Sequence, residues 1–178
     1  SLLAPYTADP AFLRYEASRE AKTATWQIDK QKGIAYMDPS MDPGAFKGPR
    51  IELPLRPMLG CIGTAPAAKA AIPTSTPDNF GGNMDYNGMG AGATVMLPVF
   101  EAGALLFLGD GHARQGDGEV LGSAIETLLD VEFSVDIVKR KKINWPRLEN
   151  QDFIMVLGSS RAINEALQDR KSTRLNSS

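Results

Sequence analysis

The residues from Gly109 to Glu119 bring together the side chains best suited to chemistry. They include His112, the single histidine of the chain, with Asp110, Asp117, Glu119 and several glycines. Carboxylates and imidazole bind divalent metals and also act as general acids and bases. Glycine allows sharp turns and close backbone approach to a ligand. Because the preceding residues 103–108 are apolar, we predict a buried strand that ends in an acidic, glycine-rich functional loop.

The bulk composition bounds what the protein can be. A chain of 178 residues can bury a core, and its net charge of -2 predicts no nucleic-acid partner. The basic run 139–142 is interpreted as a solvated strand end. Without about 18 consecutive apolar residues the chain is not expected to contact membranes. We expect a cytoplasmic protein, with a signal peptide left open because the chain does not begin with Met.

The single Cys61 allows neither an internal disulfide nor a cysteine-rich zinc site. Its apolar neighbours favour a small buried residue, and a nucleophilic Cys61 is the alternative.

Alternation of apolar and polar residues predicts a series of short strands. We place them at 21–29, 35–37, 51–57, 58–65, 93–100, 104–108, 131–138 and 153–158, with a turn at 101–103 between the fifth and sixth. Residues 38–48 are predicted as a loop, and residues 66–89 as a long structureless stretch that is functional or disordered.

One segment is predicted to be a helix, and a second segment is compatible with either a helix or a strand. A helix capped by Ser159 or Ser160 is expected to run to about Asp169. Residues 120–130 are compatible with a helix, which would place Glu119 and Glu126 on one face, or with a strand, which would pair Asp117 with Glu119; an extended start is favoured. The predicted fold class is α+β and β-rich, with β-sandwich-like strands and a small C-terminal α/β portion.

Several blocks resemble the acetamidase/formamidase family in order and spacing. They are the residues 57–66, 81–85, 97–99, 103–104, 109–119 and 124–126. The resemblance covers roughly residues 51–170 and implies a β-rich, metal-associated enzyme that hydrolyses short amides to a carboxylate and ammonia. Such an enzyme is expected to be a homo-oligomer acting on a small amide substrate.

Residues 1–50 depart from the family pattern, because they have no counterpart of its histidine- and glycine-containing N-terminal β domain. We therefore expect three regions: a poorly matched segment at 1–50, a catalytic region at 51–170 and a non-native tail at 171–178. The N-terminal β domain is expected to be truncated.

Amide hydrolysis needs an activated water, an electrophile at the carbonyl oxygen and an acid for the departing nitrogen, and a divalent metal supplies the first two. The predicted metal ligands are Asp85, Asp110 and His112, and Glu126 of the 124–126 block is the fourth. Zinc is the favoured ion and calcium the second candidate.

Proton transfer and substrate contact are assigned to other residues of the same blocks. Glu119 is the expected proton shuttle and Asp117 its alternative, with His112 also among the catalytic candidates. Substrate binding is assigned to Gly82, Asn83 and Gln115.

Each assignment has a simpler competitor. Asp85 can be a turn residue, Asp117-Gly118 is a favoured hairpin turn, and the glycines can serve turns alone. At the level of the whole protein, a calcium-stabilised β-sandwich binding module competes with the hydrolase, although calcium rarely recruits imidazole. A structural acidic loop at a subunit interface is the third interpretation.

Overall fold

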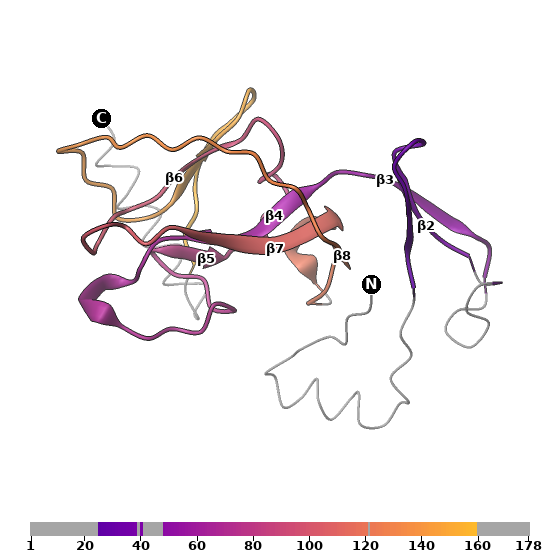
Figure 1. Cartoon of the computed structure of the whole chain (residues 1–178), viewed down its shortest axis with the longest axis horizontal. Coiled ribbons are helices and arrows are strands. Elements are labelled where there is room, and N and C mark those ends of the chain that lie inside the picture. Colours follow the sequence, from indigo (N-terminus) through magenta and orange to yellow (C-terminus); the bar gives the residue numbers. More distant parts are fainter. Residues whose placement is uncertain (1–24, 39, 41–47, 121, 160–178) are drawn as a thin grey trace. The chain divides into compact units, whose positions relative to one another are not determined.

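The computed structural model describes residues 25–38, 40, 48–120 and 122–159 (Figure 1). The expected helix from Ser159 or Ser160 and the tail at 171–178 lie outside these residues. The described part consists of short strands and two 3₁₀ turns, which confirms the β-rich prediction. The strands are β1 (Gln27–Asp29), β2 (Ile34–Met37), β3 (Ile51–Pro54), β4 (Met58–Gly63), β5 (Gly81–Asn83), β6 (Thr94–Met96), β7 (Phe107–Arg114), β8 (Ile125–Glu126), β9 (Arg147–Glu149) and β10 (Ile154–Val156), with 3₁₀ turns η1 (Ala67–Lys69) and η2 (Asp117–Glu119).

The chain divides into two compact units, and β7 runs from one into the other. Of the described residues, the smaller unit contains those up to Pro57 and those between His112 and Leu128. Its antiparallel sheet has the order β1-β2-β3, and Leu55 donates a backbone hydrogen bond to Gly33 O at 2.8 Å. The strands predicted in this part of the chain, at 21–29, 35–37 and 51–57, are therefore confirmed among the described residues.

Apolar packing holds the sequence-distant parts of this smaller unit together. Ala35 from β2 forms a buried cluster with Ala113 and Ile125, and the partly buried Trp26 and Leu53 pack against it. Arg56 N donates to Ala113 O at 2.9 Å. The backbone on either side of Ala113, including His112, is thus fixed by a core instead of belonging to a free loop.

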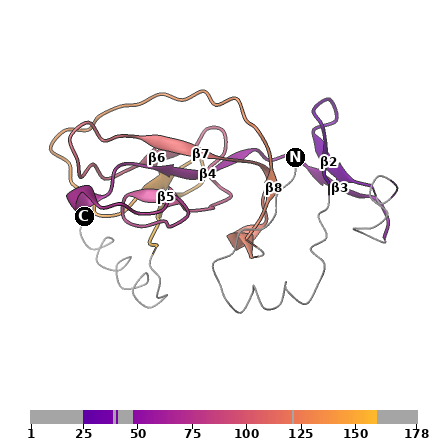
Figure 2. The ribbon, with the colours of Figure 1, turned by 60° about the horizontal axis from the view of Figure 1, so that its bottom comes forward.

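The larger unit contains Met58–Gly111 and the described residues from Leu129 onward. One of its sheets has the order β10-β9-β6, with Leu148 of β9 fully buried, and the other sheet contains β5, β4 and β7 as neighbours (Figure 2). β6 and the next strand, β7, are joined through the turn at 101–103 as predicted, and β6 pairs with β9. Positive φ angles at Gly103 (85°), Ala104 (56°) and Leu105 (51°) interrupt the extended backbone, so β7 begins only at Phe107.

Two further predictions are corrected in this region. The acidic segment expected to form a loop is largely strand, since β7 continues through Asp110 and His112 to Arg114. The stretch 66–89 was expected to lack structure, yet Gly81–Asn83 forms β5 against Cys61–Gly63. At Gly81 an added Cβ would collide with Ile62 O, and its φ is 93°. The close strand approach therefore requires glycine.

The ambiguous segment 120–130 is extended at β8, where Glu126 pairs with His112. By contrast, the half-exposed strand predicted at 131–138 does not form, and both of its faces are exposed. No helix among the described residues has the length and apolarity needed to cross a membrane.

Candidate functional site

Two carboxylates of the larger unit converge on Gly60 in β4. A Cβ built on Gly60 would lie closer than 3.0 Å to side-chain oxygens of both Asp110 and Asp85. Asp85 is held from two directions, because its backbone N–H donates to Gly60 O at 3.1 Å and Asn83 Nδ2 donates to its Oδ2. The absence of a side chain at residue 60 therefore leaves room for two acidic groups that sequence places 25 residues apart.

The two carboxylates also affect the pKa of the neighbouring Cys61 thiol. Burial, followed by the negative charges of Asp110 and Asp85, raises the pKa of Cys61 to about 11. Cys61 is buried and protonated at neutral pH, so the sequence interpretation as a small buried residue fits better than a nucleophile. A concentration of negative charge of this kind favours a cation.

In the smaller unit, the His112 side chain is completely buried between two partners. Its Nδ1 lies 2.8 Å from Gln115 Oε1, so Nδ1–H donates to the amide oxygen. Its Nε2 lies 3.1 Å from Glu126 Oε2. The other oxygen of Glu126 accepts from Ala124 N at 3.1 Å, which fixes the carboxylate. The pairing of β7 with β8 sets this geometry, since His112 and Glu126 are register partners.

Glu119 belongs to the turn η2 and lies near the same ring. One of its carboxylate oxygens is within 4.8 Å of a ring nitrogen of His112. Glu119 N donates to Gly116 O at 3.4 Å across this turn, and Gly122 N donates to Glu119 O at 2.7 Å just after it. Asp117 begins this turn and is exposed, and Gly118 has a φ of 71°, consistent with the turn function considered for Asp117-Gly118.

Backbone conformation singles out three of these acidic residues. Asp85, Asp110 and Glu119 have φ angles of 45°, 60° and 42°, in the left-handed region that few residues other than glycine adopt. Asp tolerates this region better than Glu does. The same conformation occurs outside the site at Ala68, Lys69, Ala104, Leu105 and Arg140, so the backbone strain does not by itself mark a functional residue.

Sequence reasoning named most of these residues but missed the role of Gly60. Its signal was present in the Met58–Gly63 run, where a glycine interrupts an otherwise apolar strand. The predicted substrate contacts are placed in different surroundings: Gly82 is buried in β5 with a φ of 97°, Asn83 binds Asp85, and Gln115 binds His112.

The fold of this chain is similar to the folds of solved acetamidase structures. The acetamidase from Yersinia enterocolitica matches with a TM-score of 0.71 and 32% identity, over 89% of this chain and 44% of that one. The acetamidase from Bacillus halodurans matches with a TM-score of 0.61 and 38% identity, over 69% of this chain and 41% of that one.

The sequence comparisons lead to the same family. The model of the acetamidase/formamidase family matches residues 64–155, and the chain belongs to this family. An acetamidase from Mycolicibacterium smegmatis is 40% identical over 67 residues, which are 37% of this chain and 16% of the relative. A formamidase from Methylophilus methylotrophus is 30% identical over 117 residues, 65% of this chain and 28% of the relative. The chain thus spans less than half the length of each of these relatives.

Proposed function

We propose that this chain provides the catalytic region of a hydrolase that converts short linear amides, of formamide or acetamide size, to a carboxylate and ammonia. Family membership supports the reaction class, and the relatives named acetamidase and formamidase support the substrate size. The observation that carries the proposal is the buried ring of His112, held by Gln115 on one side and facing Glu126 on the other.

We propose further that Asp85, Asp110, His112 and Glu126 hold a divalent metal. With its proton on Nδ1, a neutral His112 has a lone pair on Nε2, and this atom lies 3.1 Å from a carboxylate oxygen of Glu126. Two electron-rich atoms at this distance repel each other unless a proton or a metal cation is shared between them. Within the larger unit, the carboxylates of Asp85 and Asp110 converge on Gly60 and carry negative charge of the kind that a divalent ion requires.

The donor set favours zinc over calcium. Zinc accepts imidazole nitrogen together with carboxylate oxygen. The hydrogen bond from His112 Nδ1–H to Gln115 orients the ring, as is usual for a histidine that binds zinc through its other nitrogen. Calcium takes six to eight oxygen ligands, so a completely buried imidazole argues against the calcium-stabilised binding module.

Within this proposal, a bound metal supplies Lewis acidity toward the amide carbonyl and lowers the pKa of water. Glu119 takes a proton from the attacking water and delivers it to the leaving nitrogen. Its half-buried carboxylate near His112 suits this role better than that of the exposed Asp117. Gly82 and Asn83 remain the proposed substrate contacts, while the hydrogen bond of Gln115 supports a positioning role toward His112.

Ammonia release tests the reaction. Because the chain spans 44% of the Yersinia enterocolitica acetamidase, the assay uses a chimaera in which residues 58–156 of this chain replace the matching residues of that protein. We expect the folded chimaera to release ammonia from formamide or acetamide, and to lose this activity on chelation and regain it with zinc. A chimaera that folds, binds zinc and releases no ammonia from either amide would contradict the proposed function.

A homo-oligomer, a cytoplasmic location and the absence of nucleic-acid or membrane partners remain predictions. Light scattering of the purified chain at micromolar concentration tests the first of them.

A further inference from the structure

The side chain of Asn83 in β5 is tied to the carboxylate of Asp85, two residues further along the chain. Nδ2 of Asn83 donates a hydrogen bond to Oδ2 of Asp85. Both residues are partly buried, and a hydrogen bond to a charged carboxylate is stronger than one between neutral groups. The bond therefore determines which of the two carboxylate oxygens of Asp85 is turned toward the amide.

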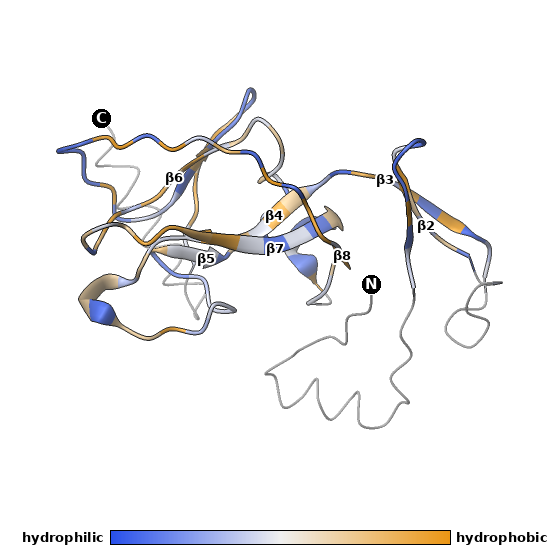
Figure 3. Ribbon diagram, in the orientation of Figure 1, coloured by the Kyte–Doolittle hydropathy of each residue, from blue (hydrophilic) through white to orange (hydrophobic). Residues whose placement is uncertain are grey.

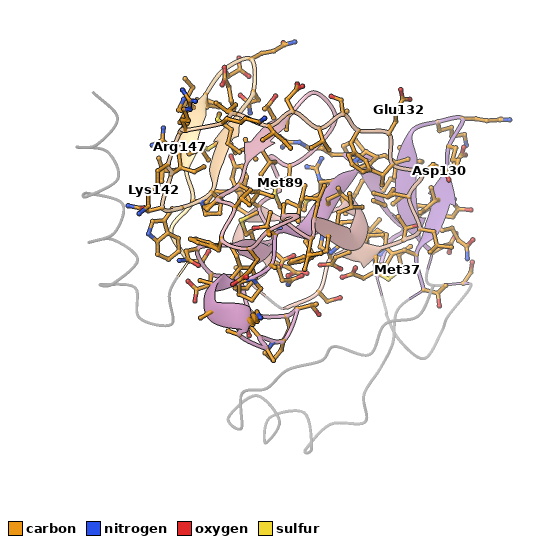
Figure 4. All side chains as sticks on the ribbon, turned by 60° about the vertical axis from the view of Figure 1, so that its left-hand side comes forward. Met37, Met89, Asp130, Glu132, Lys142 and Arg147 are labelled. Carbon is orange, nitrogen blue, oxygen red and sulfur yellow. The ribbon has the colours of Figure 1, made fainter. Side chains whose placement is uncertain are left out.

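β4 holds the backbone of both residues in place. Asn83 is the register partner of Cys61, and Asp85 N donates to Gly60 O at 3.1 Å. Just beyond them, the backbone carbonyl of Met89 accepts a hydrogen bond from β4 at 3.1 Å. Met89 is 5% exposed and lies among the packed side chains of the larger unit (Figure 4). These attachments on both sides of the pair limit how far the two side chains can rearrange.

The other oxygen of Asp85 lies on the side of a second carboxylate. A Cβ built on Gly60 would lie closer than 3.0 Å to Oδ1 of Asp85 and also to Oδ2 of Asp110 in β7. Figure 3 shows β7, the neighbour of β4 in the sheet, changing from apolar at its start to hydrophilic in its middle. Oδ2 of Asp85 is thus engaged by a neutral amide, whereas Oδ1 is placed where negative charge gathers.

We propose that Asn83 is a positioning residue that restricts Asp85 to one ligand oxygen, Oδ1, and thereby makes the site selective for zinc. It does so within the metal site proposed above, on which this inference rests. Zinc in a four-coordinate site accepts a single carboxylate oxygen, whereas calcium needs six to eight oxygens and often takes both oxygens of one carboxylate. By engaging Oδ2, Asn83 disfavours the calcium geometry. This role is additional to the substrate contact proposed for the same side chain.

The test compares the affinities of the purified chain for zinc and for calcium, each measured by calorimetric titration after treatment with EDTA. Asn83→Ala removes the donor to Oδ2, so the dissociation constant for zinc should rise about 10- to 100-fold, as is usual when a partner that orients a ligand is lost. The dissociation constant for calcium should not rise, because both oxygens of Asp85 become available to it. Asn83→Asp keeps the shape and adds an acidic oxygen, so calcium should bind about tenfold more tightly while zinc does not.

Asn150→Ala is the matched control. The side chain of Asn150 accepts backbone hydrogen bonds from Asp152 and Phe153 in the turn between β9 and β10, so its loss should leave the ratio of the two dissociation constants unchanged. Zinc binding by the wild type, together with an unchanged ratio in both Asn83 variants, would overturn this inference and leave the proposed metal site standing. A wild-type chain that binds neither ion would contradict the metal site and the role of Asn83 together.

Discussion

His112 and Glu126 face each other across β7 and β8, with Nε2 of the imidazole 3.1 Å from Oε2 of the carboxylate. The ring is completely buried, and its Nδ1 is committed to Gln115 at 2.8 Å. The remaining nitrogen must therefore share either a proton or a metal ion with Glu126. The metal-bound state depends on the metal concentration, whereas the proton-shared state does not. Substitutions of His112 and its neighbours can therefore distinguish the two states.

Substitution of the proposed ligands should remove metal and activity together. In the chimaera, Asp110→Asn and His112→Ala should each lower the bound zinc, measured by elemental analysis, in parallel with ammonia release. Glu119→Gln should retain zinc and lower the turnover number about a hundredfold, because glutamine preserves the shape but cannot accept a proton. Zinc loss in Glu119→Gln would make Glu119 a ligand and move the shuttle to Asp117 or Glu126. Wild-type activity in all three variants would contradict the site assignment.

Gln115 should act on zinc affinity through His112. Gln115→Leu removes the acceptor for Nδ1–H and leaves a buried donor without its partner, so the dissociation constant for zinc should rise about 10- to 100-fold. The free energy of unfolding should fall by about 1–3 kcal/mol. Gln115→Glu retains an acceptor oxygen and should restore most of the zinc affinity, measured by calorimetric titration. Equal affinity in the Leu variant and the wild type would exclude a positioning role.

The sequence predicted the residues of this site better than the elements that carry them. Strand alternation and glycine placement correctly indicated β1 to β4 and β10. The acidic segment was taken for a loop because glycine and charge are typical of loops, whereas its strand character depends on burial of His112 and Ala113 by distant residues. That burial involves Ala35 and Ile125, and no local pattern encodes it.

The reverse error occurred at residues 131–138, where local alternation is clear but the segment joins none of the described sheets. The convergence of Asp85 and Asp110 on Gly60 could not be predicted from spacing either, because it depends on how the backbone turns at left-handed residues.

Gly60 provides a test of this convergence. Gly60→Ala would place a methyl group closer than 3.0 Å to both carboxylates, so zinc affinity of the purified chain should fall at least tenfold. Gly109→Ala is the matched control, because an added Cβ at Gly109 meets nothing within 4 Å and the residue precedes Asp110 in β7. It should leave zinc affinity within about twofold of the wild type. Equal losses in the two variants would show that the Gly60 effect is a general disturbance of the sheet.

Cys61 gives the region a pH dependence in the metal-free protein. Burial and then the charges of Asp110 and Asp85 raise its pKa from 9.0 to about 11, so the folded chain binds the thiol proton more tightly than the unfolded chain does. This contribution to stability is complete below pH 9 and is lost as the pH rises toward 11. Urea unfolding in EDTA, compared with Cys61→Ala, should therefore show the wild type losing free energy of unfolding relative to the variant over this interval. Asp110→Asn should reduce the loss, because it removes one of the charges that hold the thiol protonated. A difference between wild type and Cys61→Ala that stays constant with pH would show that Cys61 is not in the negative surroundings described.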